Sequence, residues 1–243
     1  MRAAGVNLLF PPTCAGCGAE LQAEDEGPPA PPFCSQCIEP LGLPSGPTCP
    51  RCAARVPAAV AVRDRCYRCR GVKLWFDEAV ALGAYSGLLR EWLLNMKDAR
   101  NNVLALAVAA LIWQRCGEQI AAMEPDVVVP VPMHWRRRFV RGTNSPALLA
   151  EVFARRLGVP LAANLLRRTR HTQPQFSVPP SRRLSNVRRA FAVREGYHLD
   201  LARVLLVDDI LTTGATCSEA ARALKQGGAL RVSVVVAARA PAR

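Results

Sequence analysis

From residue 75 onward, the chain alternates between apolar runs of strand length and longer segments with helical periodicity. The runs predict buried strands at 76–85, 125–133, 204–207 and 230–240. Helices are predicted from the end of the first strand to about 122, with a break near 97–102, and at 145–158 and 218–228. Strands separated by helices imply an α/β fold, with a parallel sheet and right-handed crossovers.

Residues 1–74 show a different pattern, rich in proline and cysteine and poor in periodic segments. Eight of the ten cysteines form four C-x-x-C pairs: Cys14 and Cys17, Cys34 and Cys37, Cys49 and Cys52, Cys66 and Cys69. Two such turns supply a tetrahedral zinc shell, so the pattern predicts two structural zinc sites without an open coordination position. We expect sequential pairing of the turns, although the spacing alone also allows interlaced pairing.

This change of pattern divides the chain into two predicted units, a Cys-rich zinc-ribbon module at 1–74 and an α/β domain at 75–243. A length of 243 residues with 50% apolar residues suffices for one sizeable core and a small second module.

The net charge of +13 is concentrated in one stretch of the chain. Residues 133–194 contain fourteen arginines and a single acid, Glu151, whereas the charges of the remainder cancel. Such a one-sided distribution attracts phosphates, whether on a small molecule or on a nucleic acid.

We expect a cytoplasmic protein that does not insert into membranes. The start MRAAGVNLLFPP has too short an apolar run for a signal peptide, and polar residues interrupt the apolar stretch from 103 to 122. A reducing compartment disfavours disulfides, which also supports zinc as the partner of the cysteines.

The candidate chemistry lies in VLLVDDILTTGAT, residues 204–216. We expect Asp208 and Asp209 where a strand ends, so that their oxygens can accept hydrogen bonds from adjacent ribose hydroxyls. The threonines that follow, with Gly214, precede a helix whose N-terminus suits a phosphate monoester. This order of residues predicts a sugar phosphate site. Neither a G-x-G-x-x-G nor a G-x-x-x-x-G-K-[ST] motif follows a strand, which disfavours dinucleotide and P-loop sites.

The same thirteen residues resemble the phosphoribosyl pyrophosphate (PRPP) loop of type I phosphoribosyltransferases. More narrowly, the chain resembles the ComF family of competence-associated proteins, in which a zinc ribbon precedes such a domain. The supporting stretches are FPPTCAGC at 10–17, YSGLLREWLLNMK at 85–97, VPVPMHWRRRFVRGTN at 129–144, RRTRHTQPQ at 167–175 and SNVRRAF at 185–191. The resemblance spans nearly the whole chain and implies a parallel sheet with helices on both faces.

The resemblance also implies roles for individual residues. Asp208 and Asp209 would bind the ribose hydroxyls, and Mg²⁺ would be held chiefly by oxygens of PRPP and water. Arg141, which matches the R-G-x-N pattern, would neutralise the departing pyrophosphate and act with the two acids in catalysis. The remaining PRPP-binding positions are Thr212, Thr213, Gly214, Ala215 and Thr216 in the phosphate loop, and Val131, Pro132 and Met133 in the pyrophosphate loop.

Two alternatives remain open for the arginine-rich segment at 170–189, which has no clear period. It suits a mobile lid over the ligand, in which Arg188 or Arg189 reaches the pyrophosphate. It equally suits the backbone of single-stranded DNA, with Trp135 or Phe176 stacking on bases.

Departures from the relatives narrow the function. Thr143 and Ser145 stand where family members often have Phe and Gln, so roles at those two positions are not carried over. Thr212 replaces the Asp that assists the base in 6-oxopurine enzymes, which disfavours purine salvage. Two functions follow: Mg²⁺-dependent transfer at ribose C1 to an unidentified acceptor, or a PRPP-binding protein that engages single-stranded DNA or a helicase-like partner during DNA uptake.

Overall fold

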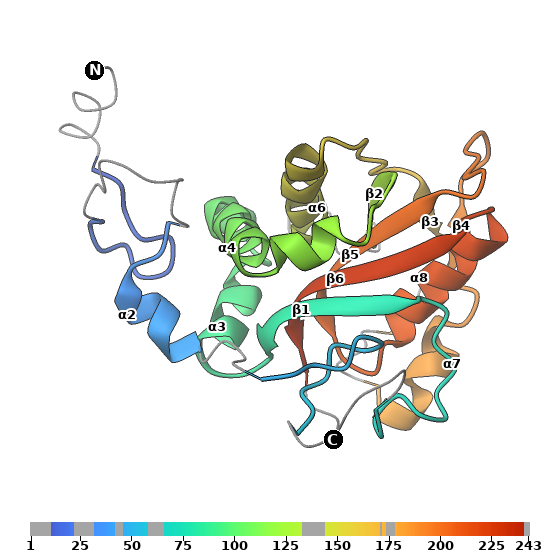
Figure 1. Ribbon diagram of the computed structural model, residues 1–243, viewed down its shortest axis with the longest axis horizontal. Helices are drawn as coiled ribbons and strands as arrows, with labels where there is room; N and C mark the ends of the chain where they lie inside the picture. Colours follow the sequence, from blue (N-terminus) through green and yellow to red (C-terminus); the bar gives the residue numbers. More distant parts are fainter. Residues whose placement is uncertain are drawn as a thin grey trace.

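The computed structural model describes residues 11–21, 32–41, 46–57, 66–132, 144–170, 172–173 and 178–240. Its centre is a four-stranded parallel sheet with the order β1-β6-β5-β2 (Figure 1). The strands are β1 (Glu78–Ala84), β2 (Val127–Pro130), β5 (Arg203–Leu211) and β6 (Arg231–Arg239). The expected parallel α/β sheet is confirmed.

Alternate residues of the central strands enter two separate hydrophobic cores, one on each face of the sheet. In β5, Val204 and Leu206 belong to one core, and Leu205 and Val207 belong to the other. All four are at most 1% exposed, which explains why this strand appears in the sequence as a continuous apolar run.

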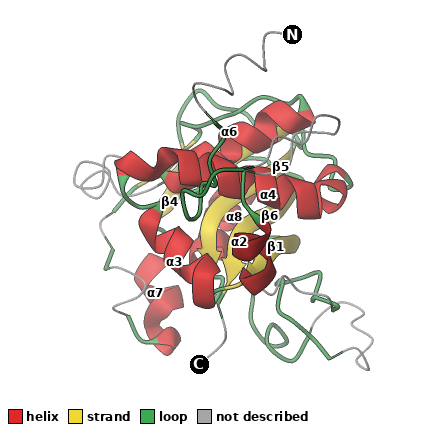
Figure 2. Ribbon diagram, turned by 90° about the vertical axis from the view of Figure 1, so that its left-hand side faces the viewer, coloured by secondary structure: helices red, strands yellow, loops and turns green. Residues whose placement is uncertain are grey.

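Helices cover both faces of the sheet, as Figure 2 shows. One face packs against α3 (Gly87–Asn95), α4 (Asn102–Ala121) and α6 (Ser145–Leu157), with the short 3-10 turn η2 (Ala99–Asn101) between the first two. The other face packs against α8 (Ala215–Gln226). Gly158 ends α6 in the left-handed conformation, as the sequence predicted, with a φ of 69°.

A second, two-stranded antiparallel sheet joins β3 (Leu166–Arg168) to β4 (Phe191–Val193) beside α8. Between these strands lie η4 (Pro180–Arg182) and α7 (Arg183–Val187), and Val187 is fully buried. These two short elements lie in the segment 170–189, in which the sequence shows no clear period.

The Cys-rich module has two parts, which contain the first four and the last four of its paired cysteines. They pack on different parts of the α/β domain. The first contains α2 (Ser35–Ile38) and η1 (Glu39–Leu41), and its Phe33 ring stacks on Trp92 of α3 with centroids 4.3 Å apart. The second unit has no helix in its described residues, and its four cysteines belong to the α8-side core.

Within the described residues, one helical segment, Ala99–Ala121, is long and apolar enough to cross a membrane. More than half of its most apolar window is buried, and α4 contacts α6, β1 and β6. This is the packing of a core helix.

Candidate phosphate loop and two cysteine clusters

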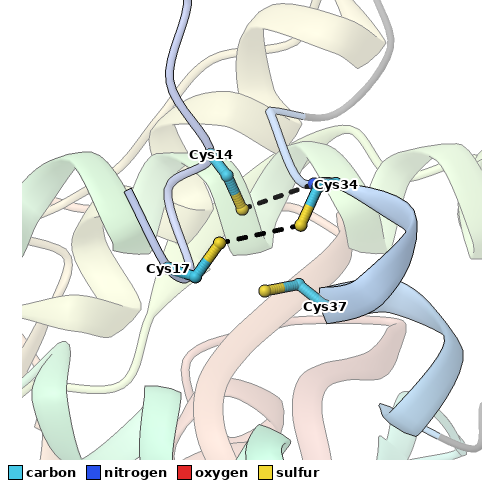
Figure 3. A group of neighbouring side chains, drawn as sticks. All are labelled: Cys14, Cys17, Cys34 and Cys37. Carbon is cyan, nitrogen blue, oxygen red and sulfur yellow. Dashed lines mark hydrogen bonds between the residues drawn. The ribbon is translucent and has the colours of Figure 1, made fainter. Parts of the chain in front are cut away.

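The eight paired cysteines form two clusters, and within each cluster all four Sγ atoms lie within 4.8 Å of one another. Cys14, Cys17, Cys34 and Cys37 make the first cluster (Figure 3), and Cys49, Cys52, Cys66 and Cys69 make the second. Sequential pairing is therefore confirmed.

The sulfur distances match the geometry of zinc. A tetrahedral ion with Zn–S bonds of about 2.3 Å separates its sulfur ligands by about 3.8 Å. The structure has 3.7 Å between the sulfurs of Cys17 and Cys34, and 3.6 Å between those of Cys52 and Cys66. Two four-thiol clusters of this size fit two structural zinc sites.

Local hydrogen bonds prepare the first cluster for a cation. The backbone N–H of Cys34 donates to Cys14 Sγ over 3.3 Å, drawn as a dashed line in Figure 3. Burial opposes ionisation of the Cys14 thiol, but this bond and neighbouring backbone N–H groups prevail and lower its pKa to about 6. Burial raises the pKa of Cys37 in the same cluster, so metal binding has to displace protons.

The two acids lie inside β5, which continues to Leu211, and not at the strand end that the sequence predicted. Asp208 pairs with Val236 in the ladder and is only 8% exposed, whereas Asp209 is partly exposed. The two polar residues interrupt the apolar run, so the sequence predicted too short a strand. The strand continues through them because β6 supplies pairing partners as far as Arg239.

Asp208 contacts Cys217 in the first turn of α8. The Sγ of Cys217 donates to Asp208 Oδ2 over 3.5 Å. Its Oδ1 accepts the backbone N–H of Asp209 at 2.9 Å. Burial raises the pKa of Asp208 well above its usual range, and the charge of Asp209 raises it further. Burial also raises the pKa of Cys217. Both effects favour the protonated form of Asp208 while no ligand is bound.

The phosphate loop, residues 212–216, leads from β5 into α8. Gly214 is the N-cap of α8 with a φ of 82°, a conformation that suits glycine. Thr213 Oγ1 accepts the N–H of Ala215 at 3.4 Å. The helix starts at Ala215, three residues before the predicted start, so Thr216 lies in its first turn. An anion approaching this loop would meet unpaired N–H groups and the positive end of the helix.

The end of β2 lies beside β5, next to the two acids. Val127–Pro130 pairs in parallel with 204–207, and the N–H of Val131 donates to the carbonyl of Val207 at 2.8 Å. The structure thus places Val131 beside Val207, the residue before Asp208. The role of Val131 and Pro132 in a pyrophosphate loop stays a prediction. Met133 and Arg141 lie outside the described residues.

An open, basic hollow of about 500 Å³ lies apart from the phosphate loop. Its lining consists of Arg170, Ser185, Arg188 and Arg189. Arg170 is already engaged, because its guanidinium donates to the carbonyls of Asn186 and Arg188 at 2.9 and 2.7 Å. The exposed side chains of Arg188 and Arg189 remain available to solvent. Trp135, His171 and Phe176 lie outside the described residues.

Sequence reasoning missed two contacts of this region, those of Cys217 and Arg239. Cys217 stands alone in the sequence, and helical spacing from the loop was the only signal that it faces the acids. Arg239 closes an apolar strand and donates to the carbonyls of Leu211 and Thr212. A single arginine at the end of an apolar strand indicates that its guanidinium binds backbone carbonyls at that edge of the sheet.

Comparison with known proteins agrees with both parts of the chain. The phosphoribosyl transferase domain model matches residues 143–243, and the double zinc ribbon domain model matches residues 5–70. Competence protein F of Haemophilus influenzae is 26% identical over 93% of this chain and 96% of its own length. DNA utilization protein YhgH of Salmonella typhi is 29% identical over 83% of this chain and 82% of its own.

Among solved structures, a purine phosphoribosyltransferase from Pyrococcus horikoshii Ot3 aligns with a TM-score of 0.32 and 15% identity. This alignment covers 66% of this chain and 85% of that one.

The sheet, the phosphate loop and the two cysteine clusters define a phosphoribosyltransferase-like α/β protein with an N-terminal zinc-ribbon module. The order of the two matched domains and the competence-related relatives agree with the resemblance seen in the sequence. The chain resembles the ComF family in both domains and in their order.

Proposed function

We propose that this protein binds PRPP with Mg²⁺ at the phosphate loop and transfers its ribosyl phosphate at C1 to an acceptor. One observation carries the proposal: the acids of β5, which follow the residues paired with the end of β2, lead within a few residues to the left-handed Gly214 and the first turn of α8. This arrangement supplies acceptors for ribose hydroxyls and donors for a phosphate within one short segment.

The accessible position of Asp209 suits it to the first contact with the ribose, and a ligand that brings hydroxyl donors and Mg²⁺ would favour the ionised form of Asp208. The N–H groups of residues 212–216 would bind the 5-phosphate. Val131, Pro132 and Met133 would flank the pyrophosphate, and Arg141 would offset its developing charge. Mg²⁺ would be held mainly by ligand oxygens and water.

The test compares the wild type with the double variant Asp208→Asn, Asp209→Asn. We expect PRPP with Mg²⁺ to raise the Tm of the wild type and to leave that of the variant unchanged, while both retain two zinc ions per chain. Equal stabilisation of both proteins would refute the assignment of the site. Transfer itself requires pyrophosphate release with at least one member of a panel of nucleobases; no release with any of them would favour binding without turnover.

A second candidate function is binding of single-stranded DNA, favoured by the hollow that three arginines line. Phosphate contacts by arginine do not depend on sequence and can coexist with a PRPP site. The relatives named for competence and DNA utilization support a DNA-related role. A helicase-like partner in DNA uptake belongs to this second candidate.

The division of the chain into units and its cellular location are also proposals. We propose that residues 1–74 and 75–243 are the two units of the chain and that the protein works in the cytoplasm. The arrangement of eight cysteines as two zinc-type clusters suits a reducing location, where thiols are kept from forming disulfides.

A further inference from the structure

Arg239, the last residue of β6, joins the second cysteine cluster to the phosphate loop. Its Nε donates to the carbonyl of Cys52 at 2.8 Å. Its Nη1 donates to the carbonyl of Leu211 at 2.9 Å and also to that of Thr212. One guanidinium therefore holds a zinc-ligand residue and the start of the loop at the same time.

These bonds help to set which way the loop amides face, together with the N–H of Ala240, which donates to the carbonyl of Leu211 at 2.9 Å. A trans peptide points its C=O and N–H in opposite directions. When the carbonyls of Leu211 and Thr212 point to Arg239, the N–H groups of Thr212 and Thr213 point away from it. Neither N–H donates to a partner in the described part of the chain. Arg239 thus orients two free donors for an incoming phosphate.

The charge of Arg239 suits this position. A zinc ion with four thiolates has a net charge of about −2, and Arg239 lies against the backbone of one of its ligands. Within the ranges that the structure describes, no carboxylate forms an ion pair with Arg239. The negative charge of the zinc–thiolate centre would therefore offset the positive charge of Arg239.

A second connection supports the same coupling. Arg51, between two ligands of the second cluster, donates to the carbonyls of Leu74 and Asp77 at 2.7 and 2.6 Å. Leu74 lies close to Gly214, since a Cβ added there would be 3.2 Å from its Cδ2. The next residue, Trp75, donates its N–H to Ser218 Oγ of α8 over 3.1 Å. The chain leaving the cluster thus also contacts the loop and the first turn of α8.

We propose that Arg239 is a positioning residue through which the closed second zinc centre sets the shape of the phosphate loop. The structural coupling stands on the contacts alone, whereas its consequence for PRPP affinity rests on the proposed function.

The first experiment needs no ligand. Hydrogen exchange of the amides of residues 211–217 is compared in the wild type, Arg239→Met and the matched control Arg231→Met. Arg231 begins the same strand and pairs with Glu78 at the surface. We expect faster exchange in the loop for Arg239→Met only, with unchanged protection in the centre of β6. Unchanged loop exchange in Arg239→Met overturns the inference.

Three further variants, Arg239→Lys, Cys69→Ser and Cys17→Ser, test whether the loop depends on the guanidinium and on the second zinc centre. Lysine keeps the charge but not the planar fork that reaches several carbonyls, so we expect it to leave loop exchange fast; full recovery would overturn the bridging role. Cys69→Ser, in the second cluster, should also speed loop exchange. Cys17→Ser, in the first cluster, should not, with zinc content measured for both. Equal effects of the two would overturn the assignment to the second centre.

The ligand arm measures the affinity for PRPP with Mg²⁺ by calorimetry. We expect Arg239→Met to bind about tenfold more weakly than the wild type, a change typical of losing oriented donors, and Arg231→Met to bind normally. Equal affinity of Arg239→Met and the wild type overturns the coupling to the ligand. If the wild type itself shows no binding, the proposed function fails, while the exchange experiment still decides the role of Arg239.

Discussion

At the scale of single residues, the two adjacent acids occupy different environments. Asp208 is buried against Cys217, and Asp209 is partly exposed. The sequence predicted both as ligands of a ribose but not their unequal burial. The difference in burial depends on the length of β5 and on the position of α8. Neither can be predicted from two adjacent aspartates.

The burial of Asp208 makes the stability of the ligand-free protein depend on pH. The folded-state pKa is raised, so above about pH 4 the unfolded chain loses this proton before the folded chain does. The contribution of this group to stability is therefore full at low pH and declines as the pH rises through the folded-state pKa. Asn cannot ionise, so we expect Asp208→Asn to unfold about 2–4 °C above the wild type near pH 8.

Calorimetric or fluorescence melting over a pH series checks this expectation. The difference in Tm should shrink as the pH falls below about 4, where Asp208 becomes protonated in both states. Asp209→Asn is the matched control, and we expect its effect on Tm to be smaller. A wild type that is more stable than Asp208→Asn at about pH 8 would contradict the burial of a protonated acid.

Gly214 allows a second test, because its left-handed φ combines with a crowded position. Ala at this position has to accept the backbone strain and also displace Leu74. We expect Gly214→Ala to lower the free energy of unfolding by about 1–2 kcal/mol or more. Gly158→Ala is the control, since Gly158 has a similar φ and nothing within 4 Å of its added Cβ. Urea unfolding of both variants measures the difference, and an equal loss would show that Leu74 does not restrict the loop.

At the scale of elements, the long apolar runs predicted the parallel strands and their helical connections. The sequence did not predict β3 and β4, because each has only three residues and its pairing is decided by tertiary contacts. It placed the end of β5 too early, because the pairing with β6 extends through polar residues. Periodicity records which side chains are buried and does not record where hydrogen-bonded pairing stops.

The two cysteine clusters differ in accessibility, which predicts two phases of zinc release. Cys17 of the first cluster is exposed, whereas all four cysteines of the second are buried. We expect a chelator to remove the zinc ion of the first cluster faster than that of the second. A colorimetric zinc indicator measures the time course of release. Cys17→Ser should abolish the fast phase and retain the slow one. Release in a single phase of two ions would contradict the difference between the clusters.

At the scale of the whole molecule, the cysteine spacing predicted the ligand sets but not how the units dock. The second cluster shares a hydrophobic core with α8 and the sheet, and the first packs on α3 through Phe33 and Trp92. Ligand spacing is a local property of the chain. Docking depends on apolar surfaces contributed by residues far apart in sequence, so only the structure reveals it.

The excess of arginine predicts the behaviour of the whole molecule toward DNA. If the hollow binds the backbone of single-stranded DNA, log K should fall steeply with log salt concentration. We expect Arg188→Ala with Arg189→Ala to reduce that slope and the Asp208→Asn, Asp209→Asn variant to leave it unchanged. Fluorescence anisotropy of a labelled oligonucleotide at several salt concentrations measures both slopes. Equal slopes in the wild type and the arginine variant would exclude this surface.

The central claim is that the segment between β5 and α8 binds a phosphorylated ribose. A crystal structure of the protein with PRPP and Mg²⁺ tests it most directly. The account predicts the 5-phosphate within hydrogen-bond distance of the N–H groups of residues 212–216, with the ribose hydroxyls at Asp208 and Asp209. PRPP bound elsewhere, or side chains filling the loop while the ligand is present at saturating concentration, would contradict it.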